Sequence, residues 1–129
     1  MAHPNEELVR TGYEAFGKGD MDTIRGLFDP NIVWHAAGRS QMAGDYKGVD
    51  AVLEQFGKVF ELTGGTFNLE IHDVMANDDH VVVLLTASAE KDGKKLEDKS
   101  VQVWHVKDGK ATEQWLHAGD QYAVDEFWG

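Results

Sequence analysis

The end of the chain holds residues whose types could do acid–base chemistry. The segment Trp115–Tyr122 reads WLHAGDQY, so the carboxylate of Asp120 follows an apolar, strand-like run and lies among a histidine and aromatic residues. Removal from water disfavours the charged form of a carboxyl group, which makes it a better proton donor or acceptor near neutrality. The alternative is that Asp120 only caps the short helix expected after it. The segment alone favours the cap, so the rest of the chain has to decide.

His35 is a second candidate for proton transfer, at the end of an expected strand over residues 31–36. Imidazole is the commonest general base in enzymes. The alternative is a histidine that is only hydrogen-bonded at a strand edge. The six histidines show no metal-binding spacing such as HExxH, and the chain has neither a GxSxG element nor a phosphate- or dinucleotide-binding glycine loop. We therefore expect no metal and no cofactor.

The composition restricts the kind of partner. The 129 residues predict a single domain over 1–129, with an ordinary hydrophobic content of 42%. A formal net charge of −11 disfavours nucleic acid and anionic membranes, and no stretch reaches the ~18 apolar residues of a membrane span. The N-terminus does not resemble a signal peptide, and there is no cysteine. We expect a cytoplasmic protein.

The hydrophobic period changes half-way along the chain. Helical spacing predicts a helix from Asn5 to about residue 16, a second from Asp20 to about residue 28, and a third over 49–62, with short strands at 31–36 and 42–46. The second half alternates with a period of two and predicts a four-strand meander with tight turns at Asp92–Gly93 and Asp108–Gly109. A short helix closes the chain. The fold class is thus α+β with a mostly antiparallel sheet.

Several segments resemble the nuclear transport factor 2-like (NTF2-like) superfamily, and more narrowly its SnoaL-like, ketosteroid-isomerase-related members. The segments that carry this resemblance are residues 13–20 (YEAFGKGD), 33–35 (VWH), 43–48 (AGDYKG), 103–110 (VWHVKDGK) and 113–115 (EQW). The resemblance implies a cone-shaped, cystatin-like α+β roll, in which a curved sheet wraps three helices of the N-terminal half. It also implies a deep apolar pocket at the open end and dimers that pair through the sheet.

The resemblance assigns roles unevenly. In ketosteroid isomerases an Asp near the end of the first strand moves a proton, and here His35 or Ala36 matches it. The family's tyrosine falls about one residue from Tyr13, and its second Asp corresponds to Gln102, so the steroid-isomerase triad is not intact. In SnoaL-like cyclases an Asp shortly after the last strand is the acid/base, and Asp120 resembles that residue. We therefore expect Asp120 as the acid/base, with His35 assisting.

Strand alternation sorts the remaining side chains. By the family match, Gln102, Trp104, Gln114, Leu116 and Ala118 share the concave face, whereas His105, Trp115 and His117 point to the convex face, where a second copy would pair. The residues expected to contact substrate are Tyr13, Phe16, Trp34, Met42, Phe56, Phe60, Gln102, Trp104, Gln114 and Leu116. A dyad of His72 with Asp20 is an alternative, although Asp20 is more simply a helix cap.

These expectations give a first and a second function. The first is a cofactor-independent isomerase, cyclase or dehydratase that does acid–base chemistry on a hydrophobic carbonyl compound. The second is a non-catalytic protein of the same fold that binds a hydrophobic ligand or dimerises. Epoxide hydrolysis ranks last, because it needs paired carboxylates and an arginine, for which Arg39 is the nearby candidate. The expected partners are a hydrophobic small molecule and a second copy of the chain.

Overall fold

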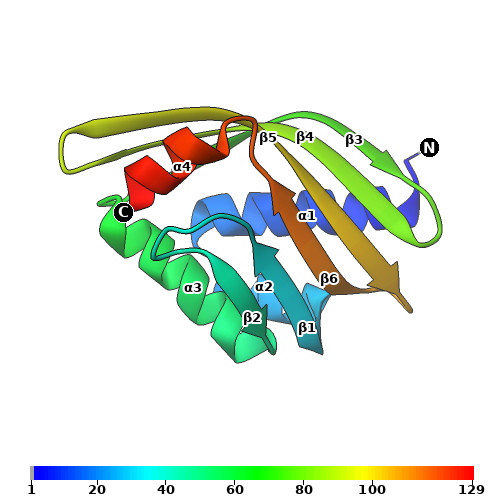
Figure 1. The fold of residues 1–129 in the computed structure, drawn as a ribbon. Helices are drawn as coiled ribbons and strands as arrows, with labels where there is room; N and C mark the ends of the chain where they lie inside the picture. The colour runs from blue at the N-terminus through cyan, green and yellow to red at the C-terminus, as the bar shows by residue number, and fades with distance from the viewer. Residues whose placement is uncertain (1) are drawn as a thin grey trace.

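The computed structural model describes residues 2–129, which form one curved six-stranded sheet and four helices (Figure 1). Along the chain the elements are α1 (Pro4–Lys18), α2 (Met21–Leu27), β1 (Phe28–Ala36), β2 (Gly44–Lys47), α3 (Val49–Leu62), β3 (Asn68–Ala76), β4 (His80–Lys91), β5 (Lys94–Lys107), β6 (Lys110–His117) and α4 (Gln121–Trp128). The strand order is β2-β1-β6-β5-β4-β3, and only the β1–β6 pairing is parallel. The predicted α+β class with a mostly antiparallel sheet is confirmed.

The first two helices begin and end at local signals. The side chain of His3, not Asn5, caps α1 by accepting a hydrogen bond from the backbone N–H of Asn5, because Pro4 can occupy the first helical position. Gly19 ends this helix at φ +69°. Asp20 then caps α2 through the backbone N–H of Thr23, as expected. The second helix is shorter than predicted, because Phe28 already belongs to β1.

The two predicted hairpin turns are confirmed, and they fix the register of the sheet. Asp92 and Asp108 both have φ +51°, and each is followed by a glycine that is also left-handed. Two successive positive φ angles match the twist of the flanking strands, which suits a two-residue hairpin. The turns join β4 to β5 and β5 to β6, so that Trp104 pairs with Val81 on one side and Gln114 on the other.

The sheet curves around the helices, and α4 lies at the opposite end of the molecule from the N-terminus, against β5 (Figure 1). The concave face packs on α1 and α3. The completely buried hydrophobic side chains of this core are Ile32, Val52, Val81, Val83 and Ala111. A smaller cluster under α4 contains Met42, Val59, Leu96, Phe127 and Trp128. None of the helices within residues 2–129 is long and apolar enough to cross a membrane.

The alternation along β4 predicts unequal costs for two equal truncations. Val83 is completely buried on the concave face, whereas its neighbour Val82 is partly exposed on the other face. We expect Val83→Ala to lower the free energy of unfolding by about 2–3 kcal/mol and Val82→Ala by about 1 kcal/mol or less. Urea denaturation of the two variants measures the difference, and equal losses would contradict the assignment of the faces.

Candidate functional site

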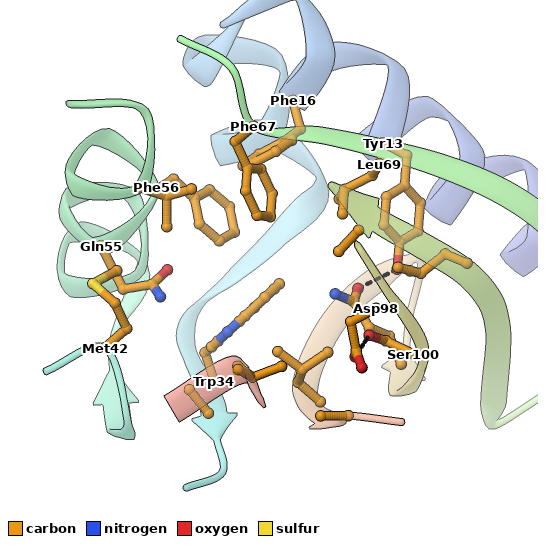
Figure 2. Close-up of a pocket in the computed structure, with 18 of the residues that line it drawn as sticks. Tyr13, Phe16, Trp34, Met42, Gln55, Phe56, Phe67, Leu69, Asp98 and Ser100 are labelled. Carbon is orange, nitrogen blue, oxygen red and sulfur yellow. Dashed lines mark hydrogen bonds between the residues drawn. The ribbon is translucent and has the colours of Figure 1, made fainter. Parts of the chain in front are cut away.

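An apolar pocket of about 120 Å³ lies between the concave face of the sheet and the helices (Figure 2). Its wall contains eight of the residues expected to contact substrate: Tyr13, Phe16, Trp34, Met42, Phe56, Gln102, Trp104 and Leu116. Phe67 and Leu69 of the β3 region also line it, as do Gln55 from α3 and two residues of β5, Asp98 and Ser100. A cavity of this size, surrounded by aromatic and aliphatic groups, suits a small hydrophobic molecule.

Packed aromatic rings form much of the pocket wall. Phe56 meets Trp34 edge-to-face at 4.8 Å between ring centroids, and it meets Phe16 edge-to-face at 5.1 Å. Trp34 in turn contacts Trp104 at 5.4 Å. Such edge-to-face contacts are favoured by the charge distribution of the rings, and large rings held on several sides have little freedom to move. We infer that the shape of the pocket is set before any ligand arrives.

A first polar group in the wall consists of Tyr13, Gln102 and Trp104. The indole Nε1 of Trp104 donates a hydrogen bond to the Tyr13 hydroxyl oxygen at 3.2 Å. The Tyr13 hydroxyl donates in turn to Oε1 of Gln102 (Figure 2). Burial raises the pKa of Tyr13 well above its usual value, and the bond from Trp104 opposes this only partly. Tyr13 therefore keeps its proton and remains a neutral hydrogen-bond donor.

The second polar group is the carboxylate of Asp98, which the sequence analysis did not single out. Its side chain is 95% buried, since Asp98 is only 5% exposed, and it lines the pocket together with Ser100 (Figure 2). Oδ2 accepts hydrogen bonds from the Ser100 hydroxyl at 2.5 Å and from the backbone N–H of Gly119 at 3.1 Å. Oδ1 accepts one from the backbone N–H of Asp120 at 2.9 Å. These three donors satisfy most of the acceptor positions of a buried carboxylate.

A signal for Asp98 was present in the sequence. Asp98, Ser100, Gln102 and Trp104 follow one another at steps of two along β5, so they share the face already assigned to Gln102 and Trp104. Extending the alternation by four residues towards the N-terminus of the strand would have placed a carboxylate in the pocket. The charged neighbours of Asp98 in the segment KKLEDK made it resemble a solvated strand end.

Neither of the two expected proton-transfer side chains lines the pocket, which corrects the expectation that both would face it. Asp120 is exposed and caps α4, where its Oδ1 accepts from the backbone N–H of Ala123 at 3.2 Å. His35 lies on the convex face because its neighbour Trp34 takes the concave side of β1. There its two ring nitrogens contact Asp45 and Glu113, each at 2.7 Å, and its ring stacks on Trp115.

Two of the expected substrate contacts lie behind the pocket wall. Phe60 packs on Phe16 at 4.8 Å but does not line the cavity. Gln114 is completely buried between its strand partners Trp34 and Trp104, and neither of its side-chain amide atoms has a hydrogen-bond partner within the described chain. The dyad alternative also changes, because Asp20 serves as a helix cap and His72 is exposed.

The described residues contain no group of three or more histidine and carboxylate side chains placed to hold a metal ion. The polar groups in the pocket are therefore described by what they do themselves. Asp98 offers an acceptor oxygen, and the group around Tyr13 offers hydrogen-bond donors, both within an apolar enclosure. This pairing can bind a polar hydrophobic molecule and can move a proton on it.

A family model described as a SnoaL-like domain matches residues 9–114, which is most of the chain. The chain belongs to the SnoaL-like family. Its structure is similar to that of Bal32a from a soil-derived mobile gene cassette, with 43% identity, a TM-score of 0.95 and coverage of 98% of this chain and 97% of that one. The predicted family membership is confirmed.

Two more distant structures extend this likeness. An NTF2-like protein from Burkholderia xenovorans has a TM-score of 0.85 at 21% identity, with coverage of 98% of this chain and 96% of that one, and it shows that the fold is NTF2-like, as predicted. TerC, which was co-crystallised with polyporic acid, has a TM-score of 0.85 at 25% identity and coverage of 97% and 98%. A small organic molecule thus accompanies one SnoaL-like relative.

The convex-face contacts of His35 predict a pH dependence. The hydrogen bond to Glu113, and then that to Asp45, raises the pKa of His35 above its usual value of about 6.5, while burial opposes the shift. Because the folded pKa is raised, the stabilisation by protonated His35 is complete below the usual value and is lost as the pH rises through the folded pKa.

We expect an NMR titration to give His35 a pKa above the usual range, and Glu113→Gln to lower it. The stability difference between wild type and Glu113→Gln should be larger near pH 5 than near pH 9. A difference that grows as the pH rises would contradict the assigned ion pair. His117, which is exposed, gives an internal comparison for the titration.

Proposed function

We propose that this SnoaL-like protein is a cofactor-independent enzyme that does acid–base chemistry on a hydrophobic carbonyl compound, with Asp98 as its acid/base. The observation that carries this proposal is the buried Asp98 carboxylate in the wall of an otherwise apolar pocket. Isomerisation, cyclisation and dehydration of carbonyl compounds share one step, the removal of a proton that the carbonyl group has acidified. A carboxylate shielded from water is suited to this step.

The hydrogen bonds around Asp98 indicate which of its oxygens would take the proton. Oδ2 already accepts from Ser100 and Gly119, which together occupy its two lone pairs. Oδ1 accepts only from the backbone of Asp120 and keeps a lone pair free. In the proposal, Oδ1 removes the proton from the substrate, while Ser100 and the two backbone N–H groups hold the carboxyl plane in place.

The pocket around Asp98 supports a hydrophobic substrate. Its wall is mostly aromatic and aliphatic, and its polar groups belong mainly to two small clusters, one at Asp98 and one at Gln102. In an enclosure without bulk water, a hydrogen-bond donor stabilises the negative charge that develops on a carbonyl oxygen more strongly than it would in solution. The co-crystallisation of TerC with polyporic acid agrees with a small organic ligand.

A non-catalytic role remains the second candidate, and one observation favours it. The three donors that hold Asp98 would equally suit a carboxylate that only anchors a polar group of a bound ligand. In this case the pocket would bind the same class of hydrophobic compound and release it unchanged. Turnover separates the two candidates.

We also propose that two copies pair through the convex face of the sheet. Partly exposed apolar side chains from three neighbouring strands support this, among them Val82, Val103 and Trp115. The ion pairs of His35 with Asp45 and Glu113 lie on the same face. Sedimentation velocity tests the proposal, and a monomer at working concentration would contradict it.

The test of catalysis uses proton exchange, so that the natural substrate need not be known. A panel of small cyclic and aromatic ketones is incubated with the protein in deuterated water, and NMR follows the loss of hydrogens that the carbonyl group activates. We expect wild type to accelerate exchange for at least one ketone, and Asp98→Asn to lower the rate about 100-fold or more, because asparagine keeps the shape but cannot take a proton.

Asp120→Asn is the matched control for this experiment. Asparagine is also a good N-cap, and the backbone N–H that holds Asp98 is unchanged, so this variant should keep both its stability and its exchange activity. Equal rates for Asp98→Asn and wild type would refute the catalytic proposal. Loss of activity in Asp120→Asn alone would return the role to the residue expected from sequence. Binding of ketones without any exchange would favour the second candidate.

A further inference from the structure

We infer that Gln102 is a specificity-determining residue, whose side-chain N–H groups are held in the pocket to bind a carbonyl oxygen of the ligand. The inference rests on the proposed function and deepens it, because it names the chemical group that the pocket recognises and the end of the pocket at which that group lies. It follows from the direction of each hydrogen bond in the group formed by Tyr13, Gln102 and Trp104.

The direction of these bonds starts at Trp104. An indole N–H can only donate, so the Tyr13 oxygen must accept from it. The one proton of the Tyr13 hydroxyl is then free to point elsewhere, and the next contact is Oε1 of Gln102, which accepts it. Because burial raises the pKa of Tyr13, the hydroxyl does not lose this proton at neutral pH.

This chain of donors decides how the Gln102 amide is turned. In most structures the two ends of a glutamine amide are assigned from their hydrogen-bond partners. Here the reversed orientation would bring the NH₂ group against the Tyr13 hydroxyl, which has already accepted from Trp104 and has a proton to donate. The carbonyl oxygen of Gln102 therefore faces Tyr13, and its NH₂ group points away from it.

The NH₂ group of Gln102 has no hydrogen-bond partner among residues 2–129, although the residue is 95% buried, with 5% exposure. Gln102 lines the pocket, so a ligand can reach this donor. Gln114 differs, because its amide is sealed behind the wall and meets no ligand. A buried donor without a partner is costly, and an acceptor on the ligand would remove that cost.

The two polar groups of the pocket thus have opposite characters. Gln102 donates, whereas Asp98 accepts, and the two lie on the same face of β5 with Ser100 between them. Four residues of extended strand separate their Cα atoms by roughly 13 Å. A ligand that reaches both extends along β5, with its carbonyl oxygen at the Tyr13 end and its acidic proton towards Asp98. Substrates that lack an acceptor at the first end should be discriminated against.

The experiment compares two probes of equal shape. Acetophenone and α-methylstyrene differ only in that a carbonyl oxygen replaces a CH₂ group, and both are of the ring size that the cavity of about 120 Å³ suits. α-Methylstyrene is the more hydrophobic, so the quantity of interest is the ratio of the two dissociation constants and its change on mutation. NMR titration measures both constants and also follows the side-chain amide signals of Gln102 directly.

We expect Gln102→Met, which keeps the volume but has no donor, to shift this ratio about 2- to 10-fold against acetophenone. Tyr13→Phe should shift it in the same direction by less, because the amide is then free to turn. In the wild-type protein the Gln102 amide signals should move with acetophenone and stay in place with α-methylstyrene. This last measurement needs no variant, so it decides the matter even if a substitution prevents folding.

Three outcomes would overturn the inference: an unchanged ratio in Gln102→Met, amide signals that respond equally to both probes, or no binding of acetophenone up to its solubility limit. Asp98→Asn separates this inference from the proposed function. It should abolish proton exchange while leaving the ratio of the two probes as in wild type. Loss of exchange in Asp98→Asn together with an unchanged ratio in Gln102→Met would refute the role of Gln102 alone.

Discussion

The alternation of side chains along the strands of one curved sheet is the constraint on which the rest of this molecule depends. Neighbouring residues of a strand must point to opposite faces, and curvature turns one face into a pocket and the other into an outer surface. Trp34 lines the pocket and His35 therefore lies outside. In the same way Trp104 lies inside and its neighbour His105 outside, in contact with Trp115. The chemistry of the pocket depends on which residue of each pair faces inwards.

Polar groups on the inner face exist under a second constraint, because a buried polar atom needs a partner. Asp98 meets this need with a hydroxyl and two backbone N–H groups, and Tyr13 with an indole and an amide. Both solutions use residues from different elements, so the pocket is correctly formed only when β5, α1 and the β6–α4 turn are all in place. Precise placement of polar groups is thus tied to the folding of the whole domain.

Much of the fold could be predicted from local patterns. The turns at Asp92 and Asp108 are short-range signals with a geometric cause, and Asp20 is a helix cap that depends on its nearest neighbours. The pocket wall was also largely predictable, because alternation and helical spacing identify inner faces. The boundary between α2 and β1 was not, since Phe28 satisfies both the apolar stripe of the helix and the inner face of the strand. Pairing with β6 decides between them.

The acid could not be located from composition, because what buries Asp98 is distant in the sequence. The segment around it is rich in lysine and glutamate, and its burial comes from the turn that follows β6. That turn is the segment which first suggested a site, and it contributes through its backbone rather than through the Asp120 side chain. Gly119 has no room for a larger residue, since an added Cβ would lie 2.4 Å from the carbonyl oxygen of Lys99. The close approach of these two backbones brings both N–H groups onto the Asp98 carboxylate, so the arrangement depends on the space that a glycine leaves.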